Sequence, residues 1–477
     1  MINELTILSY FLIMFLMNIY NIDMIFITVR YIFFRIFKKP IQDYDLDSIG
    51  GVTIQIPIYN EEPSMINKLL NSICQQTFPL ERIEIIIIDQ TDVKKIKDQT
   101  KAVVNQFTDR LSIKLIYKDR FGDGKNASTK FVAGALNLAT QYTTNNIIAV
   151  IAGDSYLHKD FLRKSLPHFE RNDVGFVLAR NAFPHDDFLT RLTRLIYNPG
   201  YIFAIMKGSM NFPNFITGNG AVLRKEIVEE MPWDTMSEDI YMSINARIRG
   251  WNVLAEKDAI VYNVGAPVSF KAFKKTYKRA AFGQTQAIKK LFNDKNARSL
   301  ALRDLQLLIH ISPTIVLPLL LTLIPLNLVL FSINISQDLG FFIIFILLGF
   351  TGMFVGIFTI ISTWMFGRMT DLIFYPLLLV YTIMILVPST IGLTRSLINK
   401  PEPFYRTQRA SESNPVIDLD IKVFEASMVI ILAILTVFYI GLSNFQGAFF
   451  FLGFLVITLF SMTNMRVSRS ENVESLA

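Results

Sequence analysis

The sequence predicts an α/β domain with a Rossmann-like, mostly parallel sheet, inserted between transmembrane α-helices. Apolar residues make up 51% of the 477 residues and charged residues only 18%, which is too apolar for one ordinary water-soluble domain. The apolar excess is concentrated at residues 5–34 and after residue 305. Between them, short β-branched runs alternate with helix-like stretches, the pattern of a soluble domain tethered by membrane helices.

The first apolar stretch, Leu5–Val29, is predicted to be a retained transmembrane helix, because its length of about 25 residues exceeds the core of a signal peptide. Four basic residues follow it and none precedes it: Arg30, Arg35, Lys38 and Lys39. The positive-inside rule therefore places residue 40 onward in the cytosol. Residues 1–39 are expected to form this anchor, and residues 40–300 a cytosolic domain.

Composition argues against several other classes of protein. The single cysteine, Cys74, excludes an intramolecular disulfide, and the four histidines lack the spacing of metal ligands. Lys and Arg cluster beside the apolar segments, so the net charge of +7 is attributed to membrane topology. No nucleic acid is expected as a partner.

From Gly51 onward the pattern is strand, helix, strand, helix, which indicates a doubly wound sheet. The expected strands are Val52–Tyr59, Arg82–Asp89, Ser112–Tyr117 and Ile147–Ala152, and the expected helices are Pro63–Gln76 and Ala127–Thr140. Neither a GxGxxG motif nor a P-loop follows any of these strands, so neither a dinucleotide site nor an ATPase is indicated.

Polar and acidic residues follow three of the expected strands: Asn60-Glu61-Glu62, then Asp89, then Asp154. Taken singly, each is typical of a turn or a helix cap. Parallel strands place their carboxyl ends along one edge of the sheet, where ligands of such folds bind. The recurrence therefore predicts a ligand site at this edge.

The run Ile56-Pro57-Ile58-Tyr59-Asn60-Glu61-Glu62 resembles the opening signature of the family 2 glycosyltransferases. Asp89 matches the acidic residue that contacts the nucleotide base in that family. The run Ala133–Asn137 resembles the family's Lys-Ala-Gly-Ala-Leu-Asn element, and Lys130, slightly upstream, is the candidate for its missing lysine. The resemblance implies a GT-A fold and a set of residues that bind a nucleotide sugar: Pro57, Tyr59, Asn60, Glu61, Asp89, Lys130 and, from a later motif, Arg279.

The run Ala152-Gly153-Asp154-Ser155 stands where the family has its Asp-x-Asp metal motif. Ala152 replaces the first aspartate and Asp154 is retained as the second. The resemblance therefore implies that Asp154 holds Mg²⁺ or Mn²⁺, with Ser155 as a weaker second ligand.

The run Thr217-Gly218-Asn219-Gly220 resembles the family's glycine-rich acceptor segment, and Ser237-Glu238-Asp239 resembles its Thr-Glu-Asp motif. A helix ending at Gly250-Trp251 follows, as in the family. The resemblance implies that Gly218, Asn219 and Gly220 bind the acceptor and that Asp239 is the general base. Glu238 would raise the pKa of Asp239 by like-charge repulsion if both point into the site. The competing interpretation is an ordinary helix N-cap.

The run Thr276–Gly283 occupies the place of the family's Gln-x-x-Arg-Trp element. Arg279 and Gly283 match, so Arg279 is the candidate clamp for the donor phosphates. Thr276 replaces the glutamine and Ala280 the tryptophan. In processive relatives this tryptophan stacks on the acceptor sugar, so its loss weakens a prediction of long-polymer synthesis. Residues 404–409 resemble a Trp-x-x-Thr-x-Arg element of a cytosolic loop.

Five apolar blocks follow residue 303: Leu305–Phe331, Leu339–Phe366, Leu372–Leu397, Phe424–Leu442 and Ala448–Met462. Simple alternation would leave the basic loop after Leu397 and the C-terminus outside, against the positive-inside rule. We therefore expect Leu372–Leu397, broken by Pro388, to be an interfacial or re-entrant helix in a membrane unit of residues 301–397. Residues 398–422 then form a cytosolic loop, and residues 423–477 a transmembrane hairpin and tail.

The resemblance thus implies an inverting hexosyltransferase that moves a sugar from a nucleoside-diphosphate donor, and the apolar segments suggest a membrane lipid or glycan acceptor at the cytosolic face. The family favours a UDP-sugar, and the richness in Ile, Asn and Lys suggests a prokaryotic cell membrane. Two alternatives stay open. One is a processive polysaccharide synthase that also translocates its product. The other is a catalytically impaired scaffold subunit, which is motivated by the altered motifs and by Asn245 where the family has arginine.

Overall fold

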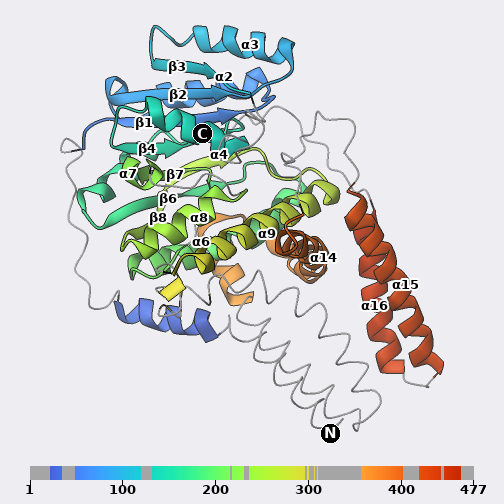
Figure 1. Ribbon diagram of the computed structural model, residues 1–477. Helices are drawn as coiled ribbons and strands as arrows, with labels where there is room; N and C mark the ends of the chain where they lie inside the picture. Colours follow the sequence, from blue (N-terminus) through green and yellow to red (C-terminus); the bar gives the residue numbers. More distant parts are fainter. Residues whose placement is uncertain are drawn as a thin grey trace.

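A computed structural model describes residues 22–34, 49–119, 131–214, 218–229, 236–295, 298–299, 356–400, 418–441 and 445–463, with the single positions 304, 306 and 309. An α/β domain occupies the middle of the chain, and helices from both ends of the chain lie along one side of it (Figure 1).

In the part of the chain that the structure describes, the domain is built on an eight-stranded sheet with the order β3-β2-β1-β4-β7-β6-β8-β5. The strands are β1 (Val52–Ile58), β2 (Ile83–Asp89), β3 (Ser112–Tyr117), β4 (Ile147–Val150), β5 (Ser155–Leu157), β6 (Val174–Ala182), β7 (Ala221–Arg224) and β8 (Asn252–Asn263). The strands β3, β2, β1 and β4 are mutually parallel, which confirms the predicted half of the sheet. The other half is mixed, because β7 runs antiparallel to β4 and β6, and β5 antiparallel to β8.

Helices cover both faces of the sheet, which explains why β2 is almost continuously apolar. Ile85 and Ile87 lie in the core cluster that contains α2 (Pro63–Cys74), whereas Ile86 and Ile88 pack with α4 (Phe131–Tyr142) on the other face. The remaining helices of the domain are α3 (Lys94–Asn105), α5 (Phe161–Ser165), α6 (Phe188–Ser209), α7 (Lys225–Glu229), α8 (Glu238–Ile248) and α9 (Phe270–Asn293).

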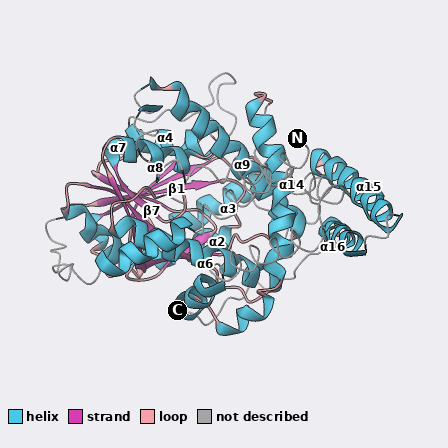
Figure 2. Ribbon diagram, turned by 90° about the horizontal axis from the view of Figure 1, so that it is seen from below, coloured by secondary structure: helices cyan, strands magenta, loops and turns pink. Residues whose placement is uncertain are grey.

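The helix α9 connects the α/β domain to the apolar part of the chain. It contacts α8 on one side and α14 (Leu377–Leu397) on the other, as Figure 2 shows. Gly392 of α14 permits this packing, since a methyl group there would lie 3.0 Å from the backbone nitrogen of Phe282. The predicted interfacial helix is therefore packed on α9, and the short helix η5 (Met369–Phe374) before it packs on α6.

Within the described part of the chain, one helix is long and apolar enough to cross a membrane, namely α15 (Leu419–Gly441). It pairs with α16 (Phe445–Met462), and the two correspond to the predicted hairpin. Shorter apolar helices span Gly356–Phe366 and Phe451–Met462. Most of the predicted segments Leu5–Val29, Leu305–Phe331 and Leu339–Phe366 lies outside the described residues.

Candidate active site

The loops after β1 and β2 are joined by their side chains at the carboxyl edge of the sheet. The Tyr59 hydroxyl and the Asn60 amide both donate to the carboxylate of Asp92, over 2.9 and 2.6 Å. Asn60 has a φ of 51°, a conformation that asparagine tolerates better than most residues. These contacts fix Tyr59 and Asn60 beside the end of β2, as the sequence predicts for ligand residues. Pro57 precedes them in β1, opposite Ile88.

Asp89 ends β2 with a side chain that is 1% exposed. Its Oδ1 accepts from the backbone nitrogen of Thr91 at 2.8 Å, and its Oδ2 has no hydrogen-bond partner among the described residues. A buried polar atom without a partner is costly, so such an atom at a ligand-binding edge is a candidate for contact with a bound molecule.

Asp154 follows β4 on the next loop of this edge. A Cβ at Gly265 would overlap the Oδ2 of Asp154 and lie 3.0 Å from its Cγ, so glycine leaves the room that this carboxylate occupies. Ser155 is fully buried, and its Oγ accepts from Asn219 Nδ2 at 2.9 Å. Ser155 is therefore engaged within the protein, whereas Asp154 is half-buried. Among the residues described, no group of three or more His, Cys, Asp or Glu side chains could hold a metal.

Asn219 links the Asp154 loop to the strand β6. Its Oδ1 accepts from the backbone nitrogen of Ala152 at 3.0 Å, and its Nδ2 also donates to Asn181 at 3.0 Å. The neighbouring Gly220 has a φ of 80°, and a Cβ there would lie 3.0 Å from Val261. The glycine-rich segment is thus fixed between β4, β6 and β8. Its role in acceptor binding stays a prediction.

The backbone nitrogen of Gly218 donates to Asp239 Oδ2 at 2.9 Å. Gly218 and Asn219 therefore connect the two predicted catalytic loops, one at Asp154 and the other at Asp239. The second oxygen of Asp239, Oδ1, accepts from the nitrogen of Ile240 at the start of α8. Two backbone N–H groups hold this carboxylate at the positive end of the helix dipole.

Glu238 and Asp239 lie side by side at the start of α8, and both are half-buried. Burial, followed by the charge of Asp239, raises the pKa of Glu238 to about 8. Burial also raises the pKa of Asp239, against the hydrogen bonds from Ile240 and Gly218 and the charge of Arg279. Both carboxyls therefore release their protons less readily than ordinary ones, and the N–H groups around Asp239 favour its anion over that of Glu238.

One face of α9 is directed toward these carboxyls. Arg279, Gly283 and Gln286 have the spacing of a single helix face. The charge of Arg279 acts on both Glu238 and Asp239, while burial lowers its own pKa. Gln286 Oε1 accepts from the backbone nitrogen of Met236 at 3.0 Å, just before α8. This face of α9 therefore fixes the start of α8, which the sequence did not predict.

The structure brings Tyr59, Asn60, Asp89 and Asp154 to one edge of the sheet and joins Asp239, Gly218 and Arg279 beside it. Lys130, Thr217 and residues 404–409 lie outside the described residues. Sequence reasoning missed Asp92 and Asn181, which hold the predicted residues in place. Asp92 could have been found, because it lies three residues after Asp89 at the predicted ligand edge of the sheet. Asn181 lies near no motif in the sequence that would have pointed to it.

The chain matches the family model "Glycosyl transferase family 2" at residues 53–231 and the model "Glycosyl transferase family group 2" at residues 147–461. It is 28% identical over 251 residues to the rice (Oryza sativa subsp. japonica) protein named "Probable glucomannan 4-beta-mannosyltransferase 4", covering 50% of this chain and 44% of that protein. The chain thus spans less than half the length of this curated relative.

Among solved structures, the chain is similar to the mannosyltransferase PcManGT from Pyrobaculum calidifontis, in complex with GDP-Man and Mn²⁺. The TM-score is 0.59 at 16% sequence identity, and the match covers 84% of this chain and 100% of that chain. At this identity, the likeness shows a shared fold.

Proposed function

This chain belongs to the family 2 glycosyltransferases and has their GT-A fold, and on that basis we propose that it transfers a sugar from a nucleoside diphosphate to an acceptor hydroxyl with inversion. The observation that carries the proposal is the environment of Asp239. Its carboxylate is held by two backbone N–H groups, faces Arg279, and is connected to the Asp154 loop through Gly218 and Asn219.

In the proposed reaction, Asp239 takes the proton of the acceptor hydroxyl as its oxygen attacks the anomeric carbon of the donor sugar. The bond between that carbon and the diphosphate oxygen breaks, and the nucleoside diphosphate leaves with the electron pair. A direct displacement of this kind inverts the anomeric centre and needs no covalent enzyme intermediate.

Glu238 and Arg279 set the charge around this base. With a pKa of about 8, Glu238 carries a proton near neutral pH and adds no second negative charge beside Asp239. Arg279 attracts the anion of Asp239, and in the proposal it also shares its positive charge with the departing diphosphate. Loss of the Arg279 charge would therefore weaken both the stabilisation of the Asp239 anion and the stabilisation of the departing diphosphate.

In the proposal, Asp89 contacts the nucleobase of the donor. Tyr59, Asn60 and Glu61 bind the rest of its nucleotide. Asp154, set against Gly265, fits a hard divalent cation that takes its remaining ligands from phosphate oxygens and water. Such an ion, Mg²⁺ or Mn²⁺, would neutralise charge on the diphosphate. Because a similar structure contains GDP-Man with Mn²⁺, GDP-mannose is tested beside the UDP-sugars that the sequence favours.

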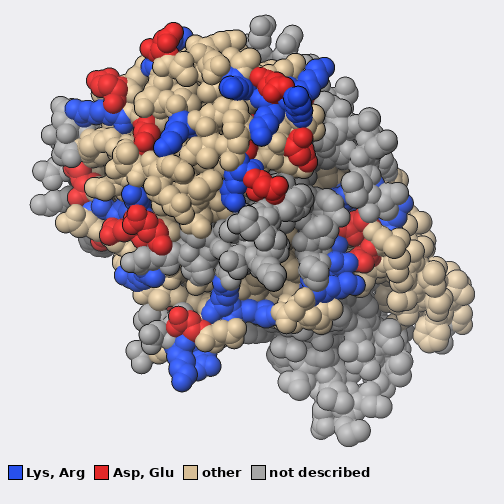
Figure 3. Space-filling model, turned by 45° about the horizontal axis from the view of Figure 1, so that its top comes forward, with Lys and Arg blue, Asp and Glu red and all other residues tan. Residues whose placement is uncertain are grey.

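The proposed acceptor is a membrane lipid or a glycan presented at the membrane surface. The hairpin α15–α16 carries an exposed apolar surface, which would be costly in water. Large side chains more than half exposed on it include Ile430, Ile434, Val437, Phe445 and Phe449. Figure 3 shows no Lys, Arg, Asp or Glu on its projecting part, whereas charged side chains are spread over the α/β domain. These features support membrane insertion of the hairpin.

The test is release of nucleoside diphosphate by the purified full chain, with GDP-mannose, UDP-glucose and UDP-N-acetylglucosamine and with either Mg²⁺ or Mn²⁺. Activity with one donor is expected, and Asp239→Asn should lower it by about 10²–10⁴-fold, the usual effect of losing a general base. Donor affinity should stay within a few-fold. No release with any donor would support the scaffold alternative, and product size separates single transfer from polymer synthesis.

A further inference from the structure

Tyr197 is an exposed aromatic residue at the edge of the proposed active site. It lies on α6, its side chain is 41% exposed, and its ring stands edge-on to that of Phe183 with 5.3 Å between ring centroids. Phe183 itself is 7% exposed and follows directly after β6. A large ring left open to solvent on a buried aromatic support is the kind of surface that binding sites use.

The end of β6 links this aromatic pair to the general base, Asp239, through the glycine-rich segment. Phe183 is two residues from Asn181, whose Oδ1 accepts from Asn219 and whose Nδ2 donates to the carbonyl of Asn219. The adjacent Gly218 donates to Asp239. The Tyr197 phenol lies within electrostatic reach of Arg279 and Asp239. Tyr197 therefore stands near the groups that are proposed to act on the acceptor.

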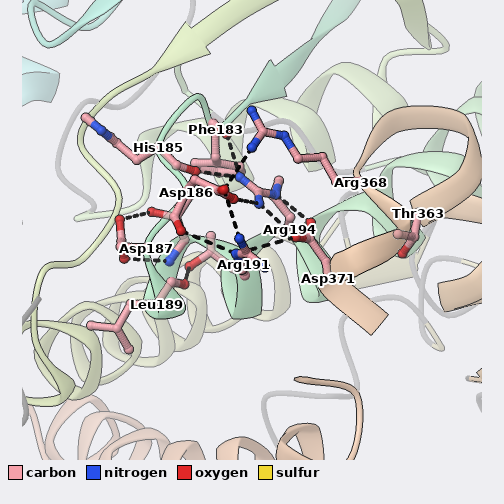
Figure 4. A network of polar contacts seen from close by, with 12 residues as sticks. Phe183, His185, Asp186, Asp187, Leu189, Arg191, Arg194, Thr363, Arg368 and Asp371 are labelled. Carbon is pink, nitrogen blue, oxygen red and sulfur yellow. Dashed lines mark hydrogen bonds and ion pairs between the residues drawn. The ribbon is translucent and has the colours of Figure 1, made fainter. Parts of the chain in front are cut away.

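The loop that carries Phe183 is held in place by Arg194, which lies one helical turn before Tyr197 on α6. Its guanidinium donates five hydrogen bonds: two to Asp371, one to Asp186, and one each to the carbonyls of Phe183 and His185 (Figure 4). These bonds match the five N–H donors of arginine. The loop that carries Phe183 is thus tied to η5 through a buried ion pair.

We infer that Tyr197 is the platform on which an acceptor sugar ring lies, so that one of its hydroxyls reaches Asp239. The inference rests on the proposed function and narrows its acceptor to a saccharide, whether a glycolipid headgroup or a free glycan. The tryptophan expected in the α9 motif is Ala280 here, which leaves α9 without that ring. Tyr197 supplies an aromatic face from α6, on a different element of the fold.

The chemistry of the platform favours a sugar over a lipid phosphate. A pyranose has an apolar face of C–H groups that packs against an aromatic ring, while its hydroxyls remain hydrogen-bonded around the rim. An aromatic face carries partial negative charge, so it gives no attraction to a phosphate. The Tyr197 ring, and not its hydroxyl, is therefore the part that determines specificity.

The experiment compares wild type, Tyr197→Ala and Tyr197→Phe. Sugar transfer from a labelled donor is measured with two kinds of acceptor: soluble mono- and disaccharides of glucose and mannose, and vesicles containing polyprenyl phosphate. Donor hydrolysis without acceptor is measured in parallel. Tyr142→Ala is the control, since this α4 tyrosine is also 41% exposed. Wild type is expected to use a saccharide. Tyr197→Ala should raise the KM for that saccharide at least tenfold, a larger change than it makes to donor hydrolysis, and Tyr197→Phe should resemble wild type.

The inference would be overturned by equal saccharide kinetics in Tyr197→Ala and wild type, by an equal loss in Tyr197→Phe, or by wild-type transfer to polyprenyl phosphate and to no saccharide. Donor hydrolysis without any transfer would overturn it as well, while leaving the donor half of the proposed function standing. Absence of both hydrolysis and transfer with every donor would instead reject the proposed function.

Discussion

Gly283 of α9 lies directly against Ser237 at the start of α8. A Cβ at Gly283 would stand 2.8 Å from both the backbone nitrogen and the Cβ of Ser237. Backbone atoms cannot move aside cheaply, so any side chain at position 283 would push the two helices apart. The glycine that ends the α9 motif therefore sets the distance between Arg279 and the carboxyls of Glu238 and Asp239.

Gly283→Ala should lower the rate of sugar transfer strongly, because small displacements of catalytic groups can cost about 10²-fold in rate. Donor affinity should change less, since Tyr59, Asn60 and Asp89 lie on other elements. The measurement is kcat and KM for the donor, with Gly453→Ala as the control, where a Cβ would meet nothing within 4 Å. A variant as active as the control would show that α9 does not set this geometry.

Glu238→Gln should stabilise the protein increasingly as the pH rises from about 5 to about 8.5. The pKa of Glu238 is about 8 in the folded protein against an ordinary 4.5, chiefly through burial. Between these values the folded state keeps a proton that the unfolded state has released, so the free energy of unfolding falls as pH rises. The glutamine variant does not titrate and escapes this loss.

The readout is the melting temperature of wild type and variant across that pH range. Glu226→Gln serves as the control, because that side chain on α7 is exposed to solvent. A difference between Glu238→Gln and wild type that does not grow with pH would contradict the raised pKa.

Ala152→Asp should lower the metal concentration needed for half-maximal activity. Ala152 is half-exposed, so a carboxylate there would not be buried, and it would stand two residues from Asp154 as in the family motif. Two carboxylates hold a hard cation more tightly than one. Titration of activity with Mn²⁺ and Mg²⁺ measures the shift, and Asp154→Ala should remove activity. Wild-type activity that survives full chelation would refute metal dependence and leave Arg279 to stabilise the diphosphate.

The segment after α14 should lie on the same side of the membrane as the α/β domain. Lys289 of α9 donates to the carbonyl of Ser396 at the end of α14, and Lys278 of α9 pairs with Asp418 before α15. Both ends of the segment are therefore fixed to α9. In intact cells carrying Cys74→Ser, Thr407→Cys should resist an impermeant thiol reagent, whereas Ser443→Cys, between α15 and α16, should react. Labelling at position 407 would reject the interfacial placement of α14.

The parallel half of the fold could be predicted because β1 and β2 are runs of branched apolar residues buried on both faces. The antiparallel strands β5 and β7 could not, since Ser155–Leu157 and Ala221–Arg224 are too short to show a period. Their pairing is set by partners far along the chain, such as the contact between Tyr156 and Tyr262.

The catalytic candidates Asp154 and Asp239 could be predicted because each stands in a motif of fixed spacing. Tyr197 could not, because its importance comes from contacts across the fold and not from its neighbours in sequence. The same holds for Arg194, whose partner Asp371 is 177 residues away.

Among the described residues, four cations of the domain are buried against carboxylates of the apolar helices or their flanking segments: Arg194 with Asp371, Lys207 with Asp23, Lys274 with Glu425 and Lys278 with Asp418. Each would be costly to leave buried without its partner. Three of the partners are synthesised long after the cations, 177, 151 and 140 residues later for Arg194, Lys274 and Lys278. During synthesis, α6 and α9 therefore cannot reach their final packing until the C-terminal segments have emerged and been placed. Maturation of the enzyme is coupled in this way to completion of its own chain, and a ribosome that stops before residue 418 leaves an unfinished catalytic domain.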